Sequence, residues 1–182
     1  RERALNIFAR EGWPVRNFIR RSCLAGVKFS DGLRIKEDVV FFLEVALRLK
    51  MMVTTDYPGY FYTRREGSAV MRRRKDADSV AFGNALLELG RRYQAEDLWR
   101  AITVAQGYDF VQWADERDPS ESYDAVLCSI RDVWRQLLME GGDHLSEMYS
   151  WWRIAIRHWL KTGDLSWAHR IRRVREWMGR FI

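Results

Sequence analysis

Apolar residues recur three and four positions apart over most of this chain, the spacing that places them on one face of an α-helix. The pattern is most regular after residue 75, where five successive segments show it. We predict helices at residues 79–93, 96–115, 120–140, 144–162 and 165–180. The connections between them are short, which favours helices packed against helices. We therefore predict a helical bundle over residues 76–182.

The first 75 residues mix two periods. Helical spacing predicts short helices at 4–12 and 15–25 and a longer one at 37–50, where Val40, Leu43 and Leu47 lie on one face. Val, Phe, Thr and Tyr favour strands at 27–29, 51–55 and 60–63 instead, and the turn residues 56–59 separate the last two. We therefore predict an α/β fold for residues 1–75, followed by the mainly helical bundle, with the whole chain mostly α.

Composition bounds the class of protein. The chain has 182 residues, 47% of them hydrophobic and nine of them Trp, which is typical of a packed globular protein and excludes a disordered one. The longest apolar run is the five residues 39–43, too short to span a membrane. No signal peptide is evident, and the chain opens on Arg1, so we expect it to begin inside a longer protein located in the cytoplasm.

Charge is distributed unevenly. Residues 1–75 carry a net charge of +9, residues 76–145 a net charge of −8, and residues 146–182 a net charge of +5. Cys23 and Cys128 stand apart, which excludes a disulfide framework. The three histidines and two cysteines show no spacing typical of metal ligands, so we predict no metal site from the motifs of this chain.

Three blocks of sequence stand out in residues 13–68. The first is WPVRNFIRRSCL at 13–24, the second combines GVKFSDG at 26–32 with EDVVF at 37–41, and the third is YFYTRREGS at 60–68. In order and spacing they resemble the C-terminal half of family 2 inverting glycosyltransferases of the GT-A fold, of the type that builds bacterial polysaccharides. The resemblance covers about a third of the chain and implies transfer of a sugar from a nucleotide-sugar donor to an acceptor hydroxyl.

The resemblance gives the two adjacent carboxylates a role. It implies that Asp38 is the general base that takes the proton from the acceptor hydroxyl, and that Glu37 helps to hold the acceptor or to shape the base. Inverting transfer does need one ionised carboxylate within hydrogen-bond reach of the attacking oxygen. The alternative is that Glu37 and Asp38 only complement the dipole of the helix that they begin.

The same resemblance implies roles for residues on either side. Arg64, Arg65, Gly67 and Ser68 would lie near the diphosphate of the leaving group, where guanidinium groups and closely approaching backbone suit the developing charge. Trp13, Arg16 and Asn17 would face the acceptor or the phosphates. The alternatives are a solvated basic loop for residues 64–68 and simple burial for Trp13.

One part of the family pattern is missing. Such enzymes hold the donor and a divalent metal, Mg or Mn, through an upstream half that ends in a D-x-D motif. The only D-x-D here, at residues 76–78, follows the Glu-Asp pair, and helix capping accounts for it. We therefore expect the metal to bind in the full-length enzyme and this chain to be inactive alone, with unpaired strands that favour self-association.

Other functions remain open. The two basic segments fit a nucleic-acid-binding module, although no helix-turn-helix signature or RNA-binding aromatic motif accompanies them, and we expect no nucleic-acid partner. The Trp-rich bundle also fits a non-catalytic adaptor. Between residues 151 and 177, five Trp alternate with Arg, a pattern that suits either a bundle core or peripheral contact with the inner membrane surface, where a lipid-linked acceptor would lie.

Overall fold

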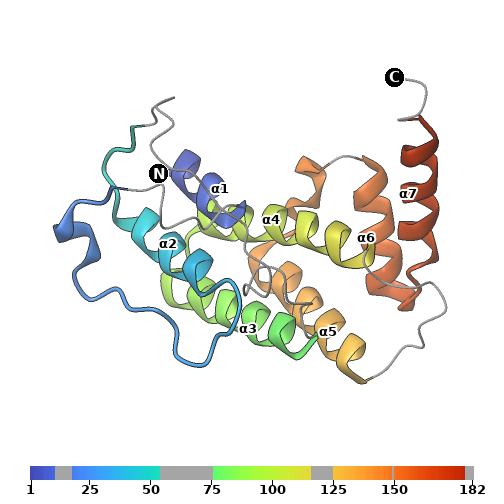
Figure 1. The fold of residues 1–182 in the computed structure, drawn as a ribbon, viewed down its shortest axis with the longest axis horizontal. Helices are drawn as coiled ribbons and strands as arrows, with labels where there is room; N and C mark the ends of the chain where they lie inside the picture. Colours follow the sequence, from blue (N-terminus) through green and yellow to red (C-terminus); the bar gives the residue numbers. More distant parts are fainter. Residues whose placement is uncertain (11–17, 54–75, 116–124, 149, 179–182) are drawn as a thin grey trace, which may run out of the picture. The chain divides into compact units, whose positions relative to one another are not determined.

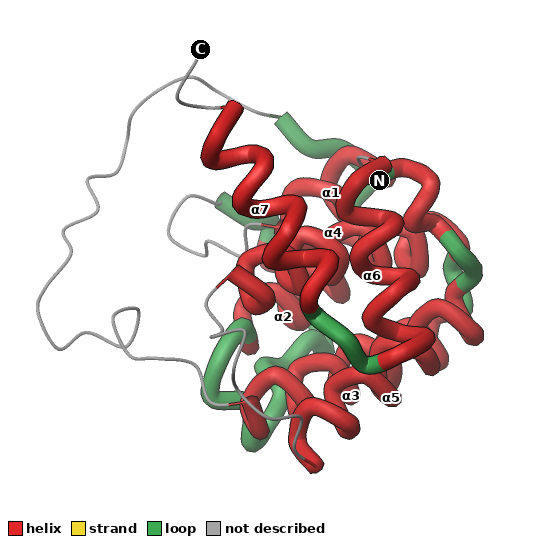
Figure 2. The backbone as a smooth tube through the Cα atoms, turned by 90° about the vertical axis from the view of Figure 1, so that its right-hand side faces the viewer, coloured by secondary structure: helices red, strands yellow, loops and turns green. Residues whose placement is uncertain are grey.

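The computed structural model describes residues 1–10, 18–53, 76–115, 125–148 and 150–178. Helices and their connections account for all of this part of the chain, and no strand occurs in it (Figures 1 and 2). The chain divides into two compact units, Arg1–Tyr93 and Gln94–Ile182. The sequence placed a boundary at residue 75, whereas the first unit also includes the helix that follows it.

The first unit contains α1 (Glu2–Arg10), the 3-10 helix η2 (Arg21–Leu24), α2 (Glu37–Arg48) and α3 (Asp76–Tyr93). Helix α2 contacts each of the other three. Its apolar residues are buried on almost every side, as expected of a helix at the centre of a unit. Phe8 of α1 packs against Phe42 with the ring centroids 5.1 Å apart.

Local sequence sets the bounds of α2. Glu37 and Asp38 occupy its first turn, where negative charge complements the helix dipole, and Arg48 lies in its last turn. Lys36 precedes the helix in the left-handed conformation, with φ of 54°. Leu49 leaves the helix in an extended conformation and donates its N–H to the carbonyl of Ala46. The helix predicted at 37–50 is therefore confirmed, two residues shorter than expected.

The predicted α/β portion is not supported. Residues 27–29 and 51–53 form no strand, and the rest of the strands predicted at 51–55 and 60–63 lies outside the described residues. A strand needs a neighbour to pair its backbone groups. The N–H of Val27 instead donates to the carbonyl of Leu24 at 3.1 Å, which continues the turn of η2. That single 3-10 turn is also the only helix among the described residues of the segment 15–25.

The second unit contains α4 (Glu96–Asp115), α5 (Ala125–Gly141), the 3-10 helix η4 (His144–Glu147), α6 (Ser150–Thr162) and α7 (Ser166–Met178). Helix α4 contacts all of the others, and its residues 101–107 are all buried. Gly107 does not break this helix, and the absence of a side chain there lets Met148 pack closely against it, because a Cβ at that position would overlap Met148. The helices of the second unit therefore lie close to the predicted ranges, except that the segment 144–162 divides into η4 and α6.

Polar contacts join the helices of this unit at their ends. Arg135 of α5 donates from Nε to the carbonyl of Leu160 at 2.9 Å, which places a cation at the C-terminal end of α6. Asp164 accepts hydrogen bonds from the backbone N–H of Ser166 at 2.8 Å and from its hydroxyl at 2.6 Å, and so caps the start of α7.

The tryptophans of α6 and α7 divide between core and surface. Trp152 and Trp159 are buried, whereas Trp151 and Trp167 are exposed. The core interpretation of the Trp-rich segment therefore holds for Trp152 and Trp159. Of the described helices, none is long and apolar enough to cross a membrane.

Candidate functional site

A cleft of about 540 Å³ lies in the first unit. Residues 26 and 28–33 form one wall, and side chains of α2 and α3 form the others. The wall formed by residues 26 and 28–33 includes most of the GVKFSDG segment, one of the motifs on which the resemblance rests. From the two helices come Val40, Glu44, Ala81, Asn84, Ala85, Glu88, Leu89 and Arg92.

Two glycines shape the wall opposite the helices. Gly26 and Gly32 have φ values of 74° and 84°, in the left-handed region that other residues rarely adopt. Gly26 turns the chain after η2, and Gly32 turns it back toward α2. Between them Phe29 is half exposed at the cleft and stacks on Phe41 of α2, with the rings 4.2 Å apart and nearly parallel.

Glu44 is the buried carboxylate of the cleft. Its Oε1 accepts a hydrogen bond of 2.7 Å from the hydroxyl of Tyr93 and one of 3.3 Å from Arg48. Arg92 lies 3.8 Å from its other oxygen. A buried charge is costly unless it is paired, and these three donors supply the pairing. Glu44 therefore joins the C-terminal ends of α2 and α3 at one side of the cleft.

The predicted base, Asp38, is half-buried in the first turn of α2. Its Oδ1 accepts the N–H of Val39 at 2.9 Å. Burial raises the pKa of this carboxyl above its ordinary value, the Val39 hydrogen bond opposes the rise, and the charge of Glu37 adds to it. A base whose pKa is higher accepts a proton more readily, provided that it stays ionised.

Glu37 and Asp38 lie on different sides of α2. The cleft side is defined by Val40 and Glu44, which are one turn apart. Glu37 precedes Glu44 by seven residues and so lies on this same side of the helix, although it is not among the residues that line the cleft. Asp38 precedes Val40 by two residues, about 160° around the helix axis, and is not among the residues that line the cleft.

The other predicted site residues lie outside the described part of the chain. They are Trp13, Arg16, Asn17, Arg64, Arg65, Gly67 and Ser68. The D-x-D sequence begins α3, and Glu96-Asp97 begins α4, so both lie in first helical turns.

Sequence reasoning missed Glu44, Arg92 and Tyr93. One signal for Glu44 was present: it interrupts the apolar run of α2 at a position one turn after Val40, on the face expected to be buried. A carboxylate there requires buried partners. Its partners on α3 lie almost fifty residues away in the sequence, and no local pattern identifies them.

The described residues contain no group of three His, Cys, Asp or Glu side chains arranged to hold a metal ion. Comparisons with models of known protein families, with curated proteins and with solved structures found no match.

Proposed function

We propose that this chain is the acceptor-binding part of an inverting glycosyltransferase, in which the cleft of the first unit holds one sugar of the acceptor and the reacting hydroxyl extends past the start of α2 to Asp38. The observation that carries the proposal is that the GVKFSDG segment, picked out by sequence resemblance, lines a cleft beside the helix that begins with Glu37 and Asp38.

The chemistry of the cleft suits a saccharide. Sugars present hydroxyl groups at their edges and C–H groups on their faces. Asn84, Glu88 and Arg92 offer amide, carboxylate and guanidinium groups to hydroxyls. The half-exposed ring of Phe29, held in place by its stack on Phe41, offers an apolar face for the C–H groups.

In the proposed reaction Asp38, which lies outside the cleft, takes the proton of an acceptor hydroxyl that reaches the first turn of α2, while that oxygen attacks the anomeric carbon of the donor. The new C–O bond forms as the bond to the diphosphate breaks, and the nucleoside diphosphate leaves with the electron pair. Glu37, on the cleft side of the same helical turn, holds a neighbouring hydroxyl of the acceptor. The raised pKa of Asp38 suits it to proton transfer.

The remaining roles rest on the resemblance alone. Arg64, Arg65, Gly67 and Ser68 would offset the charge of the leaving diphosphate, and Trp13, Arg16 and Asn17 would contact the acceptor or the phosphates. A bound Mg or Mn ion would supply further positive charge there. The described residues provide no ligand set for it, and the proton transfer to Asp38 does not involve it.

Saccharide binding can be tested on the chain itself by saturation-transfer NMR with lactose, cellobiose and chitobiose as probes. We expect saturation transfer to at least one probe, and we expect Phe29→Ala to abolish it. Met51→Ala removes a more exposed apolar side chain outside the cleft and should leave binding unchanged. Absence of binding to all three probes, or equal binding by Phe29→Ala, would contradict the proposed acceptor site.

Turnover is tested in a protein that joins this chain to its donor-binding half, by release of nucleoside diphosphate from UDP-glucose, UDP-N-acetylglucosamine or GDP-mannose. Loss of the base in Asp38→Asn should lower kcat by about 10²–10⁴-fold, with donor affinity retained. Asp78→Asn is the matched control, because Asp78 also lies in a first helical turn, that of α3, and has no role in the proposed reaction. Near-normal turnover of Asp38→Asn would remove Asp38 from the reaction.

A further inference from the structure

Exposed apolar side chains gather on α6 and α7. Trp151 is 64% exposed, Ile154 46%, Trp167 41% and Val174 55%. On α6, Trp151, Ile154 and His158 follow one another at three- and four-residue spacing. On α7, Trp167, Ile171 and Val174 do the same. Each helix therefore carries one apolar stripe on its surface, apart from its buried face.

The two stripes meet. Helices α6 and α7 contact each other and are joined by the short connection 163–165, so they run antiparallel (Figure 2). The rings of His158 and Trp167 lie 6.0 Å apart, which sets the register. One turn farther from the connection, the same register places Ile154 beside Ile171, and the next turn places Trp151 beside Val174.

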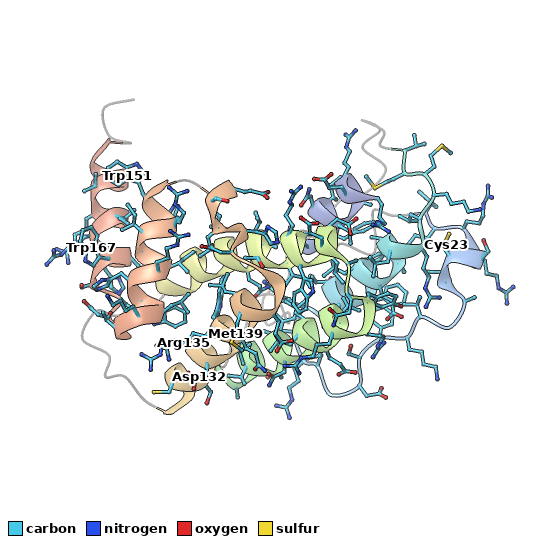
Figure 3. All side chains as sticks on the ribbon, turned by 180° about the vertical axis from the view of Figure 1, so that it is seen from behind. Cys23, Asp132, Arg135, Met139, Trp151 and Trp167 are labelled. Atoms are coloured by element: carbon cyan, nitrogen blue, oxygen red, sulfur yellow. The ribbon has the colours of Figure 1, made fainter. Side chains whose placement is uncertain are left out.

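We name these five residues, Trp151, Ile154, Trp167, Ile171 and Val174, the apolar seam. Figure 3 shows Trp167 toward the connected end of the helix pair and Trp151 toward the end where α7 finishes. Other sides of the two helices bury Trp152, Ile156, Trp159 and Ala168 in the core of the second unit. The seam is therefore additional to the core of this unit.

Positive charge borders the apolar seam. Residues 150–178 include seven Arg or Lys and only two acidic residues. Lys161 on α6 and Arg170 and Arg173 on α7 are exposed. Exposed Arg157 pairs with Asp143. One of the two acidic residues, Asp164, is engaged in capping α7.

We propose that the apolar seam and its cationic border dock on the surface of an anionic lipid bilayer. Trp side chains favour the headgroup region, where the ring is partly apolar and its N–H remains hydrated. Arg and Lys beside them attract anionic headgroups. A nucleic acid would use the cations but not two aligned apolar stripes, whereas a lipid surface uses both.

Vesicle co-sedimentation tests this proposal on the full chain. The probes are vesicles of phosphatidylcholine alone and of an equimolar mixture of phosphatidylcholine and phosphatidylglycerol. We expect binding to the mixed vesicles, little binding to phosphatidylcholine alone, and weakening as salt screens the charges. With brominated phosphatidylcholine in the mixture, Trp fluorescence should be quenched, because bromine quenches only the Trp side chains that enter the bilayer.

Variants separate the two contributions. Trp151→Ala combined with Trp167→Ala should lower the affinity for mixed vesicles about tenfold. Arg170→Gln combined with Arg173→Gln should also lower it about tenfold, since each cation near the surface contributes at most about fivefold. Met139→Ala and Lys50→Gln are the matched controls, since both side chains are exposed outside α6 and α7. Unchanged circular dichroism and thermal unfolding would show that each variant is folded.

Three results would overturn the proposal. The first is absence of binding to the mixed vesicles, and the second is equal binding by the double Trp variant. The third is a dimer in sedimentation equilibrium that the double Trp variant dissociates, because the apolar seam would then be covered by a second copy of the chain.

Discussion

The hydrogen bond between Tyr93 and Glu44 offers a direct test of how the cleft is held together. Tyr93→Phe removes only the hydroxyl that donates to Glu44 at 2.7 Å and keeps the ring. A hydrogen bond to a charged group contributes about 1.5–3 kcal/mol. Glu44 retains Arg48 and Arg92 as partners, so its charge is not left unpaired. We therefore expect a loss of about 1.5 kcal/mol, the lower end of that range.

Hydrogen exchange of the α2 backbone measures this loss. Eight of the nine Trp follow residue 93, so fluorescence reports mainly the second unit, whereas peptides from α2 and α3 report the first. A loss of about 1.5 kcal/mol corresponds to roughly tenfold faster exchange for amides that open with the whole unit. Peptides from α5 and α6 should exchange at the unchanged rate.

Glu88→Gln is the matched control. Glu88 pairs with Arg92 at 2.8 Å on the exposed surface of α3, and such pairs contribute about 0–1 kcal/mol. A double-mutant cycle of Tyr93→Phe with Glu44→Gln should give a coupling energy of about 0.5–3 kcal/mol. If Tyr93→Phe changes α2 exchange no more than Glu88→Gln does, the inference that this hydrogen bond joins α2 to α3 is refuted.

Three further changes test other parts of the structure. Gly141→Ala would place Cβ 2.7 Å from the buried ring of Trp99. Overpacking costs about 1–3 kcal/mol and Ala favours the helix by about 1 kcal/mol, so we expect a net loss of stability in urea unfolding followed by fluorescence. A more stable variant would contradict the packing of Gly141 against Trp99. Hydrogen bonds from Ser166 lower the pKa of Asp164, so ionised Asp164 stabilises the fold above its ordinary pKa, and this contribution disappears as pH falls through the lowered pKa. Asp164→Ala should therefore be less stable than the wild type at neutral pH and approach it in acid. Thermal unfolding across pH measures this difference. Burial raises the pKa of Asp38, so its negative charge lowers the stability of the fold above the raised pKa, and this cost disappears as pH falls below the ordinary pKa of Asp. Asp38→Asn should therefore unfold at a higher temperature than the wild type at neutral pH. It should lose that advantage in acid.

The sequence alone predicted the helices well where their periodicity is local. Helix α4 has the predicted bounds, and α2, α3, α5 and α7 were each located to within a few residues among those the structure describes. This follows because the i to i+4 hydrogen bonds and the buried stripe of a helix both depend on residues close together in the chain. The strand predicted at 27–29 was wrong, because a strand forms only where a distant segment pairs with it.

For the candidate site, the sequence identified Glu37, Asp38 and the glycine-bounded segment at 26–32, each recognisable from neighbouring residues alone. Only the tertiary structure decided that this segment faces α3 across a cleft, that Glu44 is held there by Tyr93, and that Asp38 lies on another side of α2. It also decided which Trp are core and which form the apolar seam. These outcomes depend on which distant segments pack against each helix, and the periodicity of one helix does not specify what its faces will meet.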